Sequence, residues 1–139
     1  MVHDNAQNRM RMRMLASPQF ERIAAMDGES FVWRIDDYPW QRSVWNCHPE
    51  VEIHLIRHST GTALIGDFVG DFRAGDLTIV GSWLPHDWIS HYSSGERLMG
   101  RDLVIQFDPN LVERVVEVFP ELSTINDLLE RSLNGVLFS

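Results

Sequence analysis

The sequence predicts a mainly β domain, an antiparallel sandwich or barrel, followed by two short α-helices. Short runs rich in β-branched and aromatic residues recur at even spacing between residues 31 and 107, and glycine, proline and aspartate separate them. After Phe107 the apolar residues change to helical spacing. The length of 139 residues fits one domain that can bury its own core.

The expected strands begin at Phe31 and end at Phe107. Phe31–Ile35 favours a strand, and residues 36–39 stop it because they include two aspartates and a proline. Gly66-Asp67 and Gly70-Asp71 indicate a kink or hairpin, and residues 74–76 a tight turn. The other strands are expected over residues 43–47, 50–58, 62–65, 77–80, 86–92 and 98–107.

Two helices are expected after the last strand. Residues 108–110 offer an N-cap, and apolar residues recur at helical spacing from Leu111 to Phe119, where a proline ends the pattern. A second apolar stripe runs from Ile125 to Leu133 and ends at an Asn-Gly pair, a common C-cap. The final residues 136–139 are apolar without a stop signal, so we expect the chain to be part of a longer protein.

Residues 1–20 are expected to form an N-terminal arm that is partly disordered. Residues 1–8 are polar and show no period. Residues 9–15 alternate arginine with methionine, which suits either an extended arm lying across a surface or a mobile tail. Residues 20–26 are too few for more than one turn of helix.

Composition excludes several classes of function. The formal net charge is −8, and all twelve basic residues are arginine, which argues against nucleic-acid binding by this part of the protein. Cys47 is the only cysteine, so no intrachain disulfide can form and a reducing compartment is expected. The sequence has no apolar run long enough to span a membrane and no signal-peptide core, so we expect a soluble cytoplasmic protein.

A row of polar residues occupies alternate positions from Asn46 to His54: Asn46, His48, Glu50, Glu52 and His54. In an extended strand, alternate side chains point to the same face. The aliphatic residues at 51, 53 and 55 would ordinarily face the core and leave the polar row in water. The row faces an interior instead if the aliphatic side is also covered, and the two C-terminal helices are the expected cover.

Several segments together resemble known motifs. His48, Glu52, Gly61, the turn at residues 74–76 and Pro85-His86 resemble the two motifs of the cupin barrel. More narrowly, four segments resemble the N-terminal effector domain of AraC-type transcriptional regulators: Cys47–Glu52, Leu64–Asp67, Ala74–Leu77 and Leu84–Trp88. The resemblance extends from about Phe31 to the end of the chain.

The resemblance implies a fold and a separate role for each part of the protein. It implies a cupin-type double-stranded β-helix, a jelly-roll barrel, over residues 21–108, with C-terminal helices over residues 109–139 that form a homodimer. The arm of residues 1–20 would fold over a bound effector. DNA would be bound by two helix-turn-helix units in a separate domain that is absent from this chain.

The resemblance also implies a metal site. His48 matches the second histidine of the first cupin motif, Glu52 its carboxylate, and His86 the histidine of the second motif. Asn46 stands where the first histidine belongs, so a zinc, nickel or iron ion would have three good ligands and a weak amide oxygen. The alternative is a set of polar side chains that hydrogen-bond a ligand or each other.

A small-molecule site is expected around the same residues, because such sites combine apolar walls with a few placed polar groups. Trp33 and Trp88 are the candidates among the tryptophans, and Arg34 is a partner for an anionic group. These three join Asn46, His48, Glu52 and His86 as the expected ligand-binding residues. His54, His58 and His91 show no further pattern and are interpreted as surface or core histidines.

Two classes of function remain. The first is a domain that senses a small molecule, a sugar or an organic acid, and passes the signal to an attached DNA-binding domain. The second is a stand-alone metal-dependent cupin enzyme, a dioxygenase, isomerase or lyase. The missing first histidine and the Leu84–Trp88 segment favour the first, and no nucleophile with its base or phosphate-binding loop is recognisable. We therefore expect a sensor rather than an enzyme.

Overall fold

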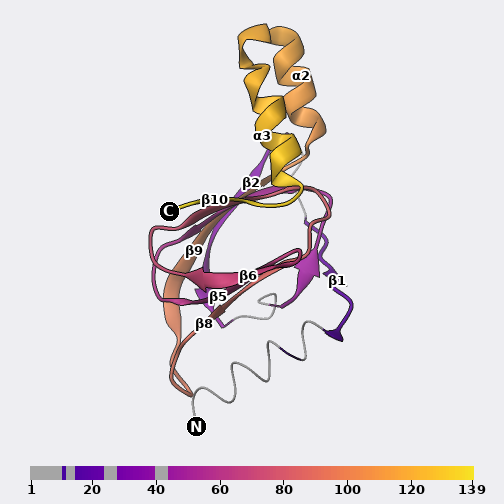
Figure 1. Cartoon of the computed structure of the whole chain (residues 1–139). Helices are drawn as coiled ribbons and strands as arrows, with labels where there is room; N and C mark the ends of the chain where they lie inside the picture. Colours follow the sequence, from indigo (N-terminus) through magenta and orange to yellow (C-terminus); the bar gives the residue numbers. More distant parts are fainter. Residues whose placement is uncertain (1–10, 12–14, 24–27, 40–43) are drawn as a thin grey trace.

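The computed structural model describes residues 11, 15–23, 28–39 and 44–139. The β-strands form two five-stranded sheets that face each other, and a pair of helices rises from one end (Figure 1). The expected mainly β fold with two C-terminal helices is confirmed. No helix among these residues has the length and apolar character needed to cross a membrane.

Successive strands along the chain mostly alternate between the two sheets. The first has the order β1-β3-β8-β5-β6, formed by β1 (Gln19–Phe20), β3 (Asn46–Cys47), β8 (His86–Ser90), β5 (Gly61–Ile65) and β6 (Phe68–Phe72). The second has the order β10-β7-β4-β9-β2, formed by β10 (Val136–Phe138), β7 (Leu77–Val80), β4 (Val51–Ile56), β9 (Leu98–Phe107) and β2 (Val32–Tyr38).

Strand pairing is nested. The hairpin β5–β6 is the innermost antiparallel pair, and β4–β7, β3–β8 and β2–β9 follow outward in the sequence. Gly66 adopts φ 58° in the turn between β5 and β6, a conformation that glycine reaches without steric cost. Nested pairing places residues some thirty to seventy positions apart in contact, which is how the early polar row meets the later strands.

The space between the sheets contains an apolar cluster. Ile56 and Val80 of one sheet pack against Ile65, Phe72 and Trp88 of the other. All five are at most 5% exposed, so each contributes about 1.5–3 kcal/mol by burial. This cluster fixes the distance between the sheets beside the polar residues.

Strand β4 is covered on both faces, as its sequence requires. Val51, 2% exposed, packs with Ile79 of β7 and Val136 of β10 on the outer side, and Leu128 and Leu129 of the second helix pack on that cluster. The expected cover by the helices is therefore confirmed for the residue 51 end of the strand, where β10 also contributes. The polar side chains at 52 and 54 consequently point between the sheets.

The helical region consists of α2 (Asn110–Val118), a 3-10 turn η1 (Pro120–Leu122) and α3 (Thr124–Ser132). Both helices match the expected ranges. The expected N-cap is a turn instead: Asp108 Oδ1 accepts a hydrogen bond from the Asn110 backbone N–H at 2.9 Å, and Pro109 occupies the cap position. Gly135, at φ 79°, redirects the chain after α3.

Several elements differ from the expectation. Residues 136–138 form β10, which pairs with β7; Val136 is buried, whereas Leu137 and Phe138 are 48% and 44% exposed. Strand β2 continues to Tyr38 rather than stopping at Ile35, because Asp36 and Tyr38 face the interior and are buried there. Gln19–Phe20 forms a short parallel strand with β3. Of the kink or hairpin expected at Gly66-Asp67 and Gly70-Asp71, the structure has the hairpin β5–β6, and Gly70 lies within β6.

Little of the expected N-terminal arm lies within the described residues. Residues 1–10 and 12–14 lie outside them, including the whole of the segment expected to be disordered. Arg11 and Leu15 have helical backbone, so the extended conformation expected from the alternation is wrong at these two positions. Leu15 is 82% exposed.

Candidate metal and ligand site

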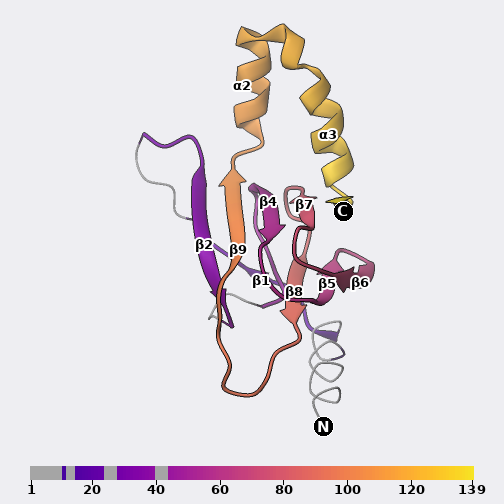
Figure 2. The same cartoon turned by 90° about the vertical axis from the view of Figure 1, so that its left-hand side faces the viewer.

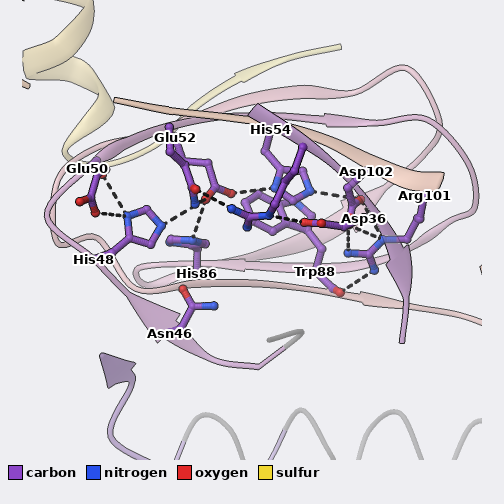
Figure 3. A network of polar contacts seen from close by, with 12 residues as sticks. Asp36, Asn46, His48, Glu50, Glu52, His54, His86, Trp88, Arg101 and Asp102 are labelled. Atoms are coloured by element: carbon purple, nitrogen blue, oxygen red, sulfur yellow. Dashed lines mark hydrogen bonds and ion pairs between the residues drawn. The ribbon is translucent and has the colours of Figure 1, made fainter. Parts of the chain in front are cut away.

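Three side chains converge between the sheets, as Figure 3 shows. Glu52 lies on β4, His86 begins β8, and His48 follows β3. The Nε2 atoms of His48 and His86 lie 3.1 Å and 3.7 Å from Glu52 Oε2. One ligating atom from each residue can be chosen so that all lie within 4.8 Å of one another, and all three residues are buried. The expected convergence of His48, Glu52 and His86 is thus present.

Backbone carbonyls fix the orientation of both imidazole rings. His48 Nδ1 lies 3.2 Å from the Glu50 carbonyl oxygen, and His86 Nδ1 lies 2.7 Å from that of Leu84. Since a carbonyl oxygen only accepts, Nδ1 is the protonated nitrogen in each neutral ring. The Nε2 lone pairs then face the Glu52 carboxylate, an arrangement that requires a proton or a metal cation between them.

The pKa shifts of His48 and Glu52 both favour the charged form of the side chain. Burial by itself lowers the pKa of His48, but the hydrogen bond and charge of Glu52, with smaller contributions from Glu21 and Glu50, raise it above its ordinary value. Burial would raise the pKa of Glu52, yet the charge of His86 and the hydrogen bonds of His48, His54 and His86 hold it well below its usual range. Glu52 is therefore an anion at neutral pH.

Two further residues hold the Glu52 carboxylate. Gln106 of β9 donates from Nε2 to Glu52 Oε2 at 2.7 Å, and His54 Nδ1 lies 2.8 Å from Oε1. Groups that hydrogen-bond a ligating carboxylate fix its direction and so influence metal affinity. Neither Gln106 nor His54 was expected at the site.

A charged network continues from His54 across the interior. His54 Nε2 lies 3.2 Å from Asp102 Oδ1, and Arg101 forms a bidentate pair with Asp102, with Nε–Oδ1 at 2.8 Å and Nη2–Oδ2 at 2.5 Å. Arg101 Nη1 also donates to the Trp88 carbonyl oxygen and to Ser90 Oγ, both at 2.9 Å. The network therefore ties β4 and β9 of one sheet to β8 of the other.

Its charges are stabilised by one another. Burial lowers the pKa of His54, but the hydrogen bonds and charges of Asp102 and Glu52 outweigh burial and raise it. Burial raises the pKa of Asp102, and the hydrogen bonds and charges of His54 and Arg101 outweigh this and lower it. Buried charges persist when they are paired in this way, and removing one partner is costly.

The free space beside the network is small. A cavity of about 30 Å³ is lined by Arg34, Asn46, Glu52, His86 and Trp88, among others. This is room for about two water molecules. Arg34 Nε lies 2.6 Å from Asp36 Oδ2, and its Nη1 donates to Gln106 Oε1 at 2.5 Å, so the guanidinium is already engaged within the protein.

Six of the seven expected ligand-binding residues lie together, and one does not. Asn46 pairs with His86 across β3 and β8, and both line the cavity. Trp88 lines it too, but its ring stacks on His54 with centroids 3.7 Å apart. Trp33 must be corrected: it is 62% exposed on β2, where alternation points Arg34 and Asp36 inward and Trp33 outward.

Strand alternation accounts for some of the site residues that were not expected. His54 shares the parity of Glu52 on β4, so strand alternation places both side chains on the same face. Asp102 and Gln106 share parity with buried Val104 on β9. Arg101 breaks this alternation beside Gly100, which adopts φ 57° where the β2–β9 register shifts. No strand period predicts a buried arginine there.

The donor set fits a divalent metal ion. Two imidazole nitrogens and a carboxylate oxygen are ligands that zinc, nickel and iron accept, and three protein ligands leave coordination positions for a small molecule. Compared with known proteins, the chain matches no protein-family model and no curated protein.

Proposed function

We propose that the chain is the sensing and dimerisation domain of an AraC-type transcriptional regulator, and that its interior binds a divalent metal ion. The observation that carries the proposal is the buried group His48, Glu52 and His86, in which two imidazole nitrogens with fixed tautomers face one carboxylate oxygen. The four sequence segments that resemble such regulators include all three residues.

Strand topology supports a cupin-type barrel. In a jelly roll the chain is wound so that the first strand pairs with the last, the second with the next to last, and so on inward. The pairs β2–β9, β3–β8, β4–β7 and β5–β6 follow this order. Of the predicted ligands, Glu52 on β4 and His86 on β8 point between the sheets (Figure 3), as does His48 just after β3, which is where a cupin holds its metal.

The helical pair supports dimerisation. Val118, Phe119 and Leu122 lie close together in the sequence where α2 passes into η1, and they are 68%, 52% and 37% exposed. Neighbouring exposed apolar side chains are typical of protein interfaces. The net charge of −8 argues against DNA binding by this chain, so we propose that a separate domain binds DNA and that the whole regulator is cytoplasmic.

The interior favours a compact effector. A cavity of about 30 Å³ does not accommodate a sugar without movement of the side chains around it. A small organic acid needs less space, because its carboxylate could serve as a ligand of a metal held by His48, Glu52 and His86. Of the two expected effector classes, the organic acid therefore requires less rearrangement.

The second candidate is a stand-alone metal-dependent cupin enzyme. The same three ligands favour it, because a metal with open positions can activate a substrate. The interior cavity limits a substrate as much as an effector, so space does not separate the two candidates. Asn46, which stands where the first motif histidine belongs, argues against the enzyme because it leaves one good ligand fewer. Turnover of a small organic acid by the metal-loaded chain would establish the enzyme.

Thermal unfolding tests the proposal. Tag-free chain is heated with zinc, nickel or iron(II), and each metal-loaded sample is then tested with sugars and organic acids. A ligand that binds only the folded chain raises the melting temperature by mass action. We expect a rise with metal and a further rise with an effector, without turnover. Turnover, or an unchanged melting temperature with every metal, would contradict the proposal.

A further inference from the structure

A second and larger cavity lies outside the barrel, at the base of the helical pair. Figure 2 shows α2 and α3 joined at the far end and diverging toward the sheets. The cavity in this region has a volume of about 340 Å³, compared with 30 Å³ for the interior cavity. A volume of this size lies within the range of small-molecule sites, about 300–1,000 Å³.

The two helices supply opposite walls. Asn110 and Glu113 are three positions apart on α2 and share a face. On α3, Asn126, Leu129 and Glu130 recur at intervals of three and four, so they also share a face. The cavity is therefore lined by residues of both helices, together with Ser82, Pro109 and Leu133 from the segments beside them.

Its floor and lower wall are apolar. Val51 of β4 lies at the floor and is 2% exposed, whereas Leu133 after α3 is 51% exposed at the rim. Leu129 is partly buried, so its exposure lies between that of Val51 and that of Leu133. An aliphatic group placed against these three side chains would lose contact with water, which favours binding.

The charged residues that line the cavity all have the same sign. Glu113 and Glu130 come from opposite helices, and no basic residue lines the cavity. Within the described part of the chain, neither carboxylate forms an ion pair. Two carboxylates around one cavity attract a cation and repel an anion, because opposite charges lower the energy of a bound ligand.

We infer that this cavity binds an organic ammonium ion with a short aliphatic chain. The ammonium group lies between Glu113 and Glu130 and donates hydrogen bonds to their carboxylates, and the aliphatic chain contacts Leu129 and Leu133. The site is independent of His48, Glu52 and His86, and it goes beyond the proposed sensing function.

Backbone amide NMR with three probes of equal length tests the inference. Hexylammonium, hexanol and hexanoate are titrated separately into the 15N-labelled chain. Hexylammonium is expected to shift the amides of residues 110–113 and 126–133 and to bind most tightly, with hexanoate weakest. Equal affinity for hexanol and hexylammonium, or shifts scattered over the surface, would overturn the inference.

Matched variants separate the cavity from general negative charge. The double variant Glu113→Gln, Glu130→Gln is expected to weaken hexylammonium binding roughly three- to thirtyfold, the range for two partly exposed ion pairs. The control Glu117→Gln, Glu121→Gln removes the same charge from exposed positions outside the cavity and is expected to change affinity less than twofold. An equal loss in both variants would overturn the inference.

A blocking variant distinguishes the ligand from a second copy of the chain. Asn126 is exposed at the cavity rim, so Asn126→Trp fills the cavity without disturbing the core, and an otherwise unchanged amide spectrum verifies the fold. Hexylammonium binding is expected to disappear in this variant. Undiminished binding would overturn the inference, as would cavity amides in the parent chain that shift with protein concentration but not with hexylammonium.

Discussion

Glu52→Gln removes the buried negative charge on which the interior network converges. The Glu52 side chain is 4% exposed and contacts His48, His54 and Gln106 at 2.7–3.1 Å. A glutamine at position 52 has only one acceptor oxygen. Its amide nitrogen would face side chains that donate hydrogen bonds to the Glu52 carboxylate, so these donors would lose their acceptor. Breaking a buried charge pair costs about 3–5 kcal/mol. This is a large share of the roughly 5–15 kcal/mol that stabilises a typical domain.

The cost is measured by urea unfolding of the metal-free chain, followed by tryptophan fluorescence. Glu50→Gln is the matched control, because the Glu50 carboxylate is 22% exposed and lies 3.6 Å from His48 Nδ1. At 3.6 Å the two atoms are farther apart than a hydrogen bond allows, so Glu50→Gln should cost less than Glu52→Gln. The reasoning is refuted if Glu52→Gln costs no more than Glu50→Gln.

Three further predictions concern packing, acid stability and the outer face. Gly61→Ala should destabilise the fold by about 3 kcal/mol in urea unfolding, because the new Cβ would lie 2.1 Å from the Ile89 carbonyl oxygen, and a cost below about 1 kcal/mol would show that the strands can move apart. The lowered pKa of Asp102 stabilises the fold above its unfolded pKa of about 3.9, and this contribution is lost as the pH falls through the folded value. The urea concentration at the unfolding midpoint should therefore fall less steeply between pH 6 and pH 2 in Asp102→Asn than in the parent chain. An equally steep fall in both would contradict the pairing of Asp102 with His54 and Arg101. Trp33→Ser, at a position 62% exposed, should leave zinc affinity unchanged in calorimetry, whereas a tenfold loss would place Trp33 at the site after all.

Strands with strong local signals could be predicted closely. The ranges of β7 and β9 match the expected residues 77–80 and 98–107, because glycine turns precede or follow continuous β-favouring runs. The two helices match because their apolar spacing changes from two to helical and a proline separates them. In each case the residues that define the element lie within it.

Elements that depend on distant partners could not be predicted. β10 has three residues, too few to show a period, and it forms because β7 offers an edge for pairing. The end of β2 was placed too early because Asp36 normally favours a turn. In the fold, Asp36 pairs with Arg34 inside, and burial, the largest influence, raises its pKa above the usual value.

The site was predictable to the extent that strand parity and motif positions define it. Parity placed Glu52 and His54 on one face, and the motif resemblance added His86 from the opposite sheet. Gln106 and Arg101 could not be predicted, because their roles come from the β4–β9 register and from a bulge beside Gly100. A residue that contacts a metal-ligand candidate from a different strand has no recognisable pattern in its own stretch of sequence.

Anomalous diffraction from crystals of the tag-free chain grown with zinc tests the central claim most directly. The account predicts one strong peak between the sheets, about 2.0–2.2 Å from His48 Nε2, His86 Nε2 and a Glu52 carboxylate oxygen. A peak bound by other residues, or no peak among these three side chains at saturating zinc, would contradict it.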